Sequence, residues 1–509
     1  MTASNSTRAL RVLILCLFAI LLVACGRQDP PTTQAVAEDE VVETVDTKVP
    51  VTTSSEQALA LYDEAQALID DLHFTEARPI LEQAVAADPG FAMAYVLMLG
   101  TAQTAADFFI AIENAQANAE GSSAGEQLII RSVAAGARND QAAQLTELKD
   151  LLTMHPGDER THNRLANYYA AQQEFENALM HYGHAIAINP EFAAAYNSMG
   201  YAHRSNDDLE SAREAFKKYV ELIPGEANPH DSYAELLMEI GQYEDSIENY
   251  RKALAIDRNF AASYAGISIN ESLRGDEAAA LESAAQMLSV ARTPGEKRGA
   301  LAQSVTSHLF AGNTDAAIAA SNEVFAVASS QGDSAGMGDV REYMGDIMVA
   351  TGDGTKALEY YESALGYRQE SEINEANKAQ AERTHLYKSA LANMVNDDYD
   401  GAVALTAQFT RAVESAGTAF ERRRVHALEG YLALIREDNE TAVTELAQAN
   451  NLNPVVLYWS AVANRNAGNL ETAKDLAFRA ANRNTLSANL PFRRGEALQL
   501  LADLQAEQE

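Results

Sequence analysis

Basic residues and cysteines are scarce in this chain of 509 residues, which has 38 lysines and arginines, 73 acidic residues and two cysteines. The formal net charge of −35 argues against nucleic acid or an anionic lipid surface as the binding partner of the folded part. Such a charge is typical of a soluble protein or of one that binds basic partners. Because both cysteines, Cys16 and Cys25, lie at the N-terminus, the chain after them can form no disulfide and has no catalytic thiol.

The first 24 residues have the pattern of a targeting segment. Arg8 and Arg11 form a positively charged start, and an unbroken apolar run of 13 residues follows from Val12 to Ala24. This run fits the apolar part of a signal peptide and is short for a helix that spans a membrane.

The end of this segment carries a second signal. Residues 22–25 read Leu-Val-Ala-Cys and are followed by Gly26, which resembles the lipobox of bacterial lipoproteins. The resemblance implies that residues 1–24 are removed as a signal peptide and that Cys25 is acylated and anchors the protein in the cell envelope. Glycine rather than aspartate after the cysteine resembles the class that Gram-negative bacteria sort to the outer membrane, facing the periplasm. An ordinary signal peptide with an incidental cysteine is the alternative.

Residues 25–55 have the composition of a tether. Pro30, Pro31 and the acidic run at residues 38–40 stand among threonines and serines, and large apolar residues are few. Nothing in this stretch could form a core, so we expect it to be disordered.

Four segments repeat with a period of 34 residues between Glu159 and Pro294, and large apolar and small residues return at the same offsets in each. The second segment shows the pattern with Tyr196, Met199, Gly200, His203, Ala212, Phe216, Tyr219 and Pro224. A fixed period of this length is typical of a stacked array, in which each unit buries its apolar face against its neighbours.

The pattern resembles the tetratricopeptide repeat (TPR). The resemblance implies an all-α, TPR-like α-solenoid, a right-handed superhelix of about twelve helix-turn-helix repeats, with weaker copies on both sides of the regular four. A glycine-rich segment at residues 332–338 suggests an N-terminal TPR block at 56–331 and a C-terminal TPR block at 338–489. Residues 490–509 are expected to form a capping helix that covers the exposed end of the array.

Ligands of arrays of this family meet the first helix of each unit, and this resemblance implies a row of partner-binding residues in the regular block. The row consists of Arg160, Asn163, Asn167, Asn197, Tyr201, Arg204, Asn228, Asp231 and Glu235. A merely solvated inner wall is the alternative for this row. Comparable positions further along the chain hold Tyr387, Tyr431 and Tyr458, with Trp459 adjacent, and could line a second, more apolar site.

Three motifs suggest chemistry but fit the repeat pattern better. His181 and His184 could share a metal, yet no third ligand is implied nearby. Residues 396–401 imitate half of a calcium loop but have Ala407 where the bidentate glutamate is needed. Residues 352–356 lack the spacing of a phosphate-binding loop.

The sequence therefore predicts a non-enzymatic protein without cofactor or metal. Outside the tether, no stretch longer than about 20 residues escapes the helical pattern, so no room is left for a catalytic domain. We expect a lipid-anchored scaffold or adaptor of the bacterial envelope that binds envelope proteins or extended peptide segments in its concave groove. A glycan-binding or polysaccharide-export accessory TPR lipoprotein is the alternative. The sequence names neither the partner nor the oligomeric state, and it does not decide between the groove and the convex face.

Overall fold

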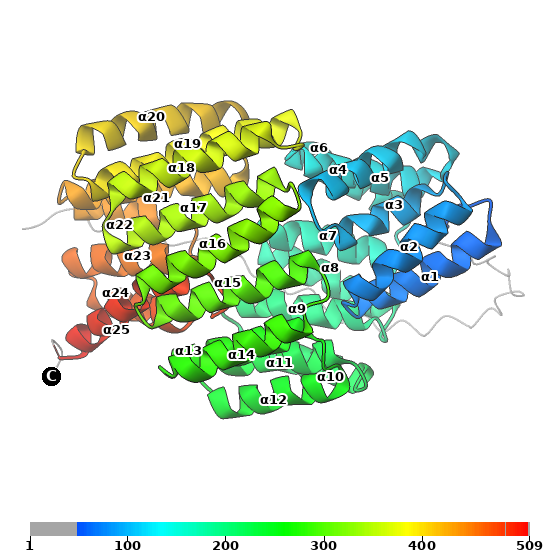
Figure 1. Ribbon diagram of the computed structural model, residues 1–509, viewed down its shortest axis with the longest axis horizontal. Coiled ribbons are helices and arrows are strands. Elements are labelled where there is room, and N and C mark those ends of the chain that lie inside the picture. The colour runs from blue at the N-terminus through cyan, green and yellow to red at the C-terminus, as the bar shows by residue number, and fades with distance from the viewer. Residues whose placement is uncertain (1–47, 484, 507–509) are drawn as a thin grey trace, which may run out of the picture. The chain divides into compact units, whose positions relative to one another are not determined.

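Helices account for the regular structure in the part of the chain that the computed structural model describes, residues 48–483 and 485–506. Helices α1 to α24 form twelve consecutive helix-turn-helix pairs, and α25 follows as a single last helix (Figure 1). No β-strand occurs among these described residues. The predicted all-α, TPR-like solenoid is confirmed, and Cys25 and the signal segment lie outside the described residues.

The helix pairs follow one another through the chain with short connections. The first seven pairs are α1 Glu56–Asp70 with α2 Phe74–Ala87, α3 Ala92–Met98 with α4 Ala105–Ala117, α5 Ala124–Ala137 with α6 Gln141–Met154, α7 Glu159–Ala171 with α8 Phe175–Ile188, α9 Ala193–Ser205 with α10 Leu209–Leu222, α11 Ala227–Glu239 with α12 Tyr243–Ile256, and α13 Ala261–Leu273 with α14 Glu277–Val290. The later helices are α15 Pro294–Phe310 with α16 Thr314–Ser330, α17 Ser334–Thr351 with α18 Gly354–Glu370, α19 Glu375–Val395 with α20 Tyr399–Ala416, α21 Ala419–Ile435 with α22 Asn439–Gln448, α23 Pro454–Asn466 with α24 Leu470–Asn482, and α25 Leu490–Ala506. Two short 3₁₀ helices, η1 Leu99–Thr101 and η2 Ala119–Gly121, flank α4.

The turn inside a pair has a consistent local chemistry. The chain reverses through a residue in the left-handed region, such as Gly241 with φ 79° or Asp207 with φ 63°. The second helix of the pair then starts at an N-cap, and Asp208 shows the usual form by accepting a hydrogen bond from the backbone N–H of Ser211. This cap satisfies one of the free N–H groups at the start of α10 and fixes where the helix begins.

The helices lengthen in the second half of the array. Helices α7 to α14 have 13 or 14 residues each, whereas α15 to α21 have 17 to 21. The segment at 332–338, where the sequence suggested a division into two blocks, holds one turn residue, Gly332, and the first residues of α17. Helix α17 packs against α16 across this turn, so helical stacking continues through it.

Residues 48–55 differ from the expectation that they belong to a disordered tether. They are extended, and their backbone is held by carboxylates of the first repeats. The N–H of Val49 donates to Asp158 Oδ2 at 3.0 Å, and the N–H of Thr52 donates to Glu126 Oε1 at 2.7 Å. The segment is thus ordered because the repeats supply acceptors for its backbone N–H groups and an apolar surface for Val49.

Helix pairs that are seven apart in the chain contact one another. The first and eighth pairs meet where Thr75 Oγ1 donates to Glu296 Oε1 at 2.8 Å. The third and tenth pairs meet where Asn374 Nδ2 donates to the carbonyl oxygen of Ala137 at 3.0 Å. The array therefore turns back on itself after about seven pairs.

The same spacing continues toward the C-terminus. Arg423 of the eleventh pair donates to the carbonyl oxygen of Gln172 in the fourth, and Arg483, just after α24, lies 3.2 Å from Asp207 of the fifth. Leu490 of α25 is fully buried against residues of α11 and α13. These contacts cover part of the inner surface, which the sequence alone presented as one long open groove.

Candidate binding site

A cavity with a volume of about 590 Å³ lies on the first helices of the last four pairs. Helices α17, α19, α21 and α23 supply most of its wall, and the turn at Gln173 and the start of α25 complete it. A cavity of this size, with a mainly apolar wall and a few charged groups, has the usual character of a ligand site. Its aromatic and charged lining residues are Asp346, Tyr387, Lys388, Tyr399, Phe420, Arg423, Arg424, Tyr431, Trp459, Phe492 and Arg493.

Three of the four aromatic residues predicted for a second, more apolar site line this cavity. Tyr387, Tyr431 and Trp459 stand on α19, α21 and α23, and the rings of Tyr431 and Trp459 lie 6.3 Å apart between centroids. Tyr458 is absent from the wall because its side chain packs into the core toward α24 and α25. Three consecutive first helices thus each place an aromatic side chain in the cavity wall.

The charges at the cavity are the reverse of those of the whole chain. Four lining residues are cationic and one, Asp346, is acidic, in a protein with almost twice as many acids as bases. Lys388 is paired with Asp346 at 2.6 Å, and Arg493 is paired with Glu496 at 2.7 Å. Two cations, Arg423 and Arg424, have no ion pair among the described residues.

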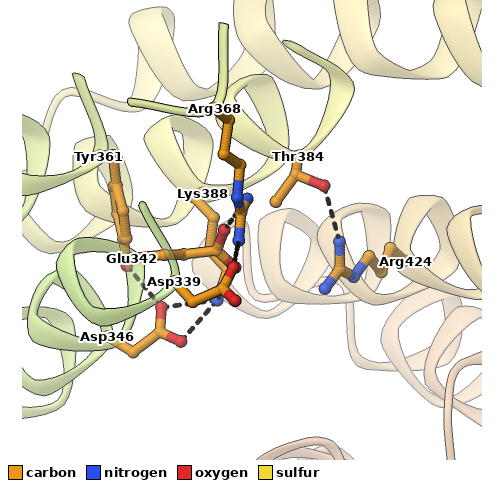
Figure 2. Close-up of polar contacts among 8 residues, drawn as sticks. All are labelled: Asp339, Glu342, Asp346, Tyr361, Arg368, Thr384, Lys388 and Arg424. Carbon is orange, nitrogen blue, oxygen red and sulfur yellow. Dashed lines mark hydrogen bonds and ion pairs between the residues drawn. The ribbon is translucent and has the colours of Figure 1, made fainter. Parts of the chain in front are cut away.

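A partly buried ion network supports one side of the cavity. Figure 2 shows the side chains of Arg368 and Lys388 directed at three carboxylates of α17. Arg368 lies 2.7 Å from Asp339 and also contacts Glu342, while Lys388 joins Glu342 and Asp346. The opposite charges hold α17, α18 and α19 in fixed positions behind the cavity.

Arg424 is oriented by aromatic rings. Its guanidinium lies 4.8 Å from the ring centroid of Tyr387 and 4.5 Å from that of Phe420, and it donates to Thr384 Oγ1 at 3.4 Å (Figure 2). Burial alone would raise the pKa of Glu342, but the charges of Lys388, Arg368 and Arg424 lower it below its ordinary value. The charge of Arg424 therefore acts across the cavity wall while its donors stay largely free.

The predicted row in the regular block has a different environment. Arg160 is paired with Asp70 at 2.6 Å, and Asn167 accepts a hydrogen bond from the Tyr182 hydroxyl at 2.7 Å. Arg204 is buried and lies 2.9 Å from Glu235. These side chains join neighbouring helices, and their role in partner binding stays a prediction.

The other residues of the row are also mostly engaged within the protein. The Tyr201 hydroxyl donates to Ser232, Asn228 donates to the Tyr219 hydroxyl, and Asp231 accepts from the hydroxyl of Ser263. Burial and then the charge of the nearby Glu235 raise the pKa of Asp231 well above its ordinary value. The sequence spacing did not reveal that most of these side chains are engaged by neighbouring helices.

Two amides of this row differ from the rest. The side-chain oxygens of Asn163 and Asn197, which are 34 residues apart, are buried and have no hydrogen-bond partner within the described residues. An acceptor without a partner is costly when buried. Because the two oxygens are enclosed, a partner does not reach them in this arrangement, and the role of both residues in partner binding stays a prediction.

The histidine pair considered as a metal site belongs to a cluster of three. His181 stacks on Tyr169, its Nδ1 lies 3.2 Å from Nδ1 of His162, and His184 lies beside both. No group that could hold a metal ion is found among residues 48–483 and 485–506. Burial, and then the neighbouring His162 and His184, lower the pKa of His181 to about 4.

This histidine cluster predicts a pH dependence of stability. Because the lowered pKa lets the unfolded chain bind protons first, the contribution of His181 is complete above about pH 6.5 and is lost as the pH falls toward 4. We expect a loss of about 1–2 kcal/mol, less than a fully buried group would give, since part of the cluster is solvated. Thermal melts between these pH values should show a smaller decline for His181→Phe than for the wild type, and equal declines would contradict the assignment.

The two loop-like motifs are turns of repeats. Asp398 caps α20 by accepting from the N–H of Gly401, and Asp353 caps α18 in the same way.

Within the described residues, no helix has the length and apolar character needed to cross a membrane.

Comparison with known proteins identifies the repeats. Residues 163–227 and 230–260, which are part of the regular block, match the tetratricopeptide repeat family. The α-solenoid thus contains tetratricopeptide repeats, and proteins built from such repeats commonly act as interaction scaffolds.

Individual relatives share only parts of the chain. A CTR9 homolog of Arabidopsis thaliana is 31% identical over 130 residues, and subunit 3 of the anaphase-promoting complex of Schizosaccharomyces pombe is 25% identical over 95. These matches span 12% and 14% of the relatives' own lengths. A solved tetratricopeptide repeat protein from Parabacteroides merdae is 15% identical over 53% of this chain and 98% of its own, with a TM-score of 0.37. YrrB, described as a TPR protein with an unusual peptide-binding site, is 16% identical over 35% of this chain and 91% of its own, with a TM-score of 0.26.

Proposed function

We propose that this protein is a non-catalytic, lipid-anchored scaffold or adaptor of the bacterial envelope, which holds partner proteins whose segments enter the cavity at the last four helix pairs. The observation that carries this proposal is the cavity of about 590 Å³ with Tyr387, Tyr431 and Trp459 on successive first helices. The helices that bear these rings are packed against neighbours on both sides, so a partner segment meets a preformed surface and loses its own chain entropy alone.

The N-terminal row adds a second contact region to the proposal. Asn167 of this row is exposed, so its side chain is open to a partner. Two separate contact regions on one array would raise the apparent affinity for a partner long enough to reach both.

The membrane anchor is proposed from the lipobox resemblance at Cys25. Metabolic labelling with a fatty acid should mark the wild type, and the membrane fraction should retain it. The Cys25→Ser variant should lose the label and leave the membrane fraction. Retention of the label in this variant would overturn the proposed anchor.

A selection from a random peptide library tests the proposed binding site. Trp459 is the single tryptophan of the chain and lies in the cavity wall, so its fluorescence reports occupancy directly. Enriched peptides should shift its emission and bind about tenfold more weakly to Tyr431→Ala. Phe478→Ala, which alters an exposed ring on α24 away from the cavity, should bind them as the wild type does. Enriched peptides that bind Tyr431→Ala as tightly as they bind the wild type would overturn the proposal.

The glycan-binding alternative rests on the same aromatic residues, since sugar rings stack on flat aromatic faces. Tyr431 and Trp459 line the cavity and could serve this role. Tyr201 is less suited, because Phe216 and Arg204 contact its ring. Titration of Trp459 fluorescence with soluble oligosaccharides tests it, and a saturating change without any peptide binder would favour the glycan.

A further inference from the structure

We propose that the segment bound in this cavity is acidic, with carboxylates that meet Arg424 and Arg423 and apolar side chains that pack on the aromatic wall. The inference rests on the proposed function and adds the chemical class of the partner. It depends on how charge is distributed in this protein and on which of the cations already have partners.

The first observation is the local reversal of charge. The whole chain has 73 acidic and 38 basic residues, yet the cavity wall has four cations and a single carboxylate. An acidic protein repels acidic segments over most of its surface. A cationic cavity in that surroundings selects an acidic segment in one place and disfavours its binding elsewhere.

The second observation is the pairing of these cations. Lys388 is neutralised by Asp346 and Glu342, and Arg493 by Glu496. Arg424, by contrast, contacts two aromatic rings and the Thr384 hydroxyl and forms no ion pair within the described residues. Arginine in this state has donors left for the bidentate bond that a carboxylate makes with a guanidinium.

Arg423 likewise forms no ion pair within the described residues. It donates to the backbone carbonyl of Gln172, and burial and then the charge of Arg422 lower its pKa from the ordinary arginine value. A carboxylate bound beside it would offset the repulsion between neighbouring arginines. Arg423 and Arg424 are neighbours on α21 and both line the cavity, so one acidic segment can contact both.

The third observation is the apolar surface beside the cations. Tyr431, Trp459 and Phe492 line the cavity with aliphatic residues of α19 and α21. Carboxylates alone would leave this surface uncovered, so the fitting segment carries leucine-like or aromatic side chains between its acidic residues. A basic segment finds one carboxylate in the described cavity wall, Asp346, and Lys388 already pairs with it.

Three synthetic peptides of one length, capped at both ends, test the inference on the full chain. In the first, glutamate alternates with leucine; in the others, glutamine or lysine replaces the glutamate. We expect the glutamate peptide to change Trp459 fluorescence with an affinity about tenfold above that of the glutamine peptide. This ratio should fall as salt rises from about 20 mM to about 300 mM, because screening weakens charge attraction. The lysine peptide should bind most weakly.

A pair of neighbouring variants supplies the control. Arg424→Gln should reduce the preference for glutamate over glutamine to about twofold or less. Arg422→Gln removes the same charge from an exposed side chain outside the cavity wall and should keep the preference. Equal affinities of the glutamate and glutamine peptides, or equal effects of the two variants, would overturn the inference.

The outcomes also separate this inference from the proposed function. If library selection yields peptides that depend on Tyr431 but carry no acidic residues, the acidic class is wrong and the binding site stands. If selection yields no peptide that depends on Tyr431 and none of the three peptides binds, the proposed function itself fails.

Discussion

Replacing Arg383 by methionine is expected to lower the free energy of unfolding by about 3–5 kcal/mol, because it leaves the carboxylate of Glu421 buried without its cation. Arg383 Nε lies 2.7 Å from Glu421 Oε1, and the glutamate is fully buried between α19 and α21. Its second oxygen accepts from the N–H of Thr418 at 2.9 Å and completes a capping box. The pair thus joins two successive repeats and fixes the start of the helix that bears Arg424.

Two further variants make this prediction specific. Arg422→Met changes an exposed arginine on α21, next to Glu421. Its free energy of unfolding should stay within about 0.5 kcal/mol of that of the wild type. Replacing Arg383 by methionine and Glu421 by leucine together should recover much of the loss, since no buried charge is left alone. Urea denaturation followed by circular dichroism measures all three, and a loss below about 1 kcal/mol for Arg383→Met would contradict the account.

Gly200→Leu is expected to destabilise the fifth pair by roughly 1–3 kcal/mol or more, through overpacking. A Cβ atom at Gly200 would lie 2.7 Å from the ring of Phe216, which is closer than real Cβ contacts. The two helices of the pair, α9 and α10, would have to move apart. Gly345 faces Tyr361 in the same way in the ninth pair, so the close approach is a property of the repeat.

A second glycine provides the matched control. Gly183 lies inside α8, and a Cβ atom there would meet nothing within 4 Å. Gly183→Leu should therefore leave stability unchanged or raise it slightly, because leucine favours helix over glycine. Equal melting temperatures of Gly200→Leu and Gly183→Leu, measured by circular dichroism, would show that the assigned register is wrong.

The sequence predicted the fold in detail because the repeat is a local pattern. Small residues such as Ala212 and Gly200 recur where two helices of a pair cross, and the turn residues return every 34 positions. Each helix pair thus follows from about 34 neighbouring residues, and stacking follows from the apolar faces. The number of pairs could be predicted for this reason, whereas the longer helices α15 to α21 depart from the 34-residue period of the regular block.

Contacts between distant pairs could not be predicted in this way. The bond from Arg423 to Gln172 joins residues 251 apart, and Leu490 packs against α11 and α13. Nothing in the period of the repeat shows which pairs meet after one turn of the array. For the same reason, the sequence identified the aromatic residues of the cavity but not the closure over the row that contains Arg204.

The charges of the candidate site show the same limit. Arg422, Arg423 and Arg424 form one basic run in the sequence, and the run alone gives no reason to separate them. The structure separates them, since Arg422 is exposed while Arg423 and Arg424 line the cavity. Which arginines have ion-pair partners depends on carboxylates of other repeats and could be found from coordinates alone.

In-cell photocrosslinking from Phe420 tests the central claim most directly. Phe420 lines the cavity and is 40% exposed, so a photoreactive phenylalanine analogue fits there; Phe478 on α24 is 42% exposed and serves as the control outside the cavity. The account predicts that position 420 traps one dominant envelope protein, identified by mass spectrometry, and that position 478 does not. Crosslinks of that protein from position 478 alone, with none from position 420, would contradict binding in the cavity.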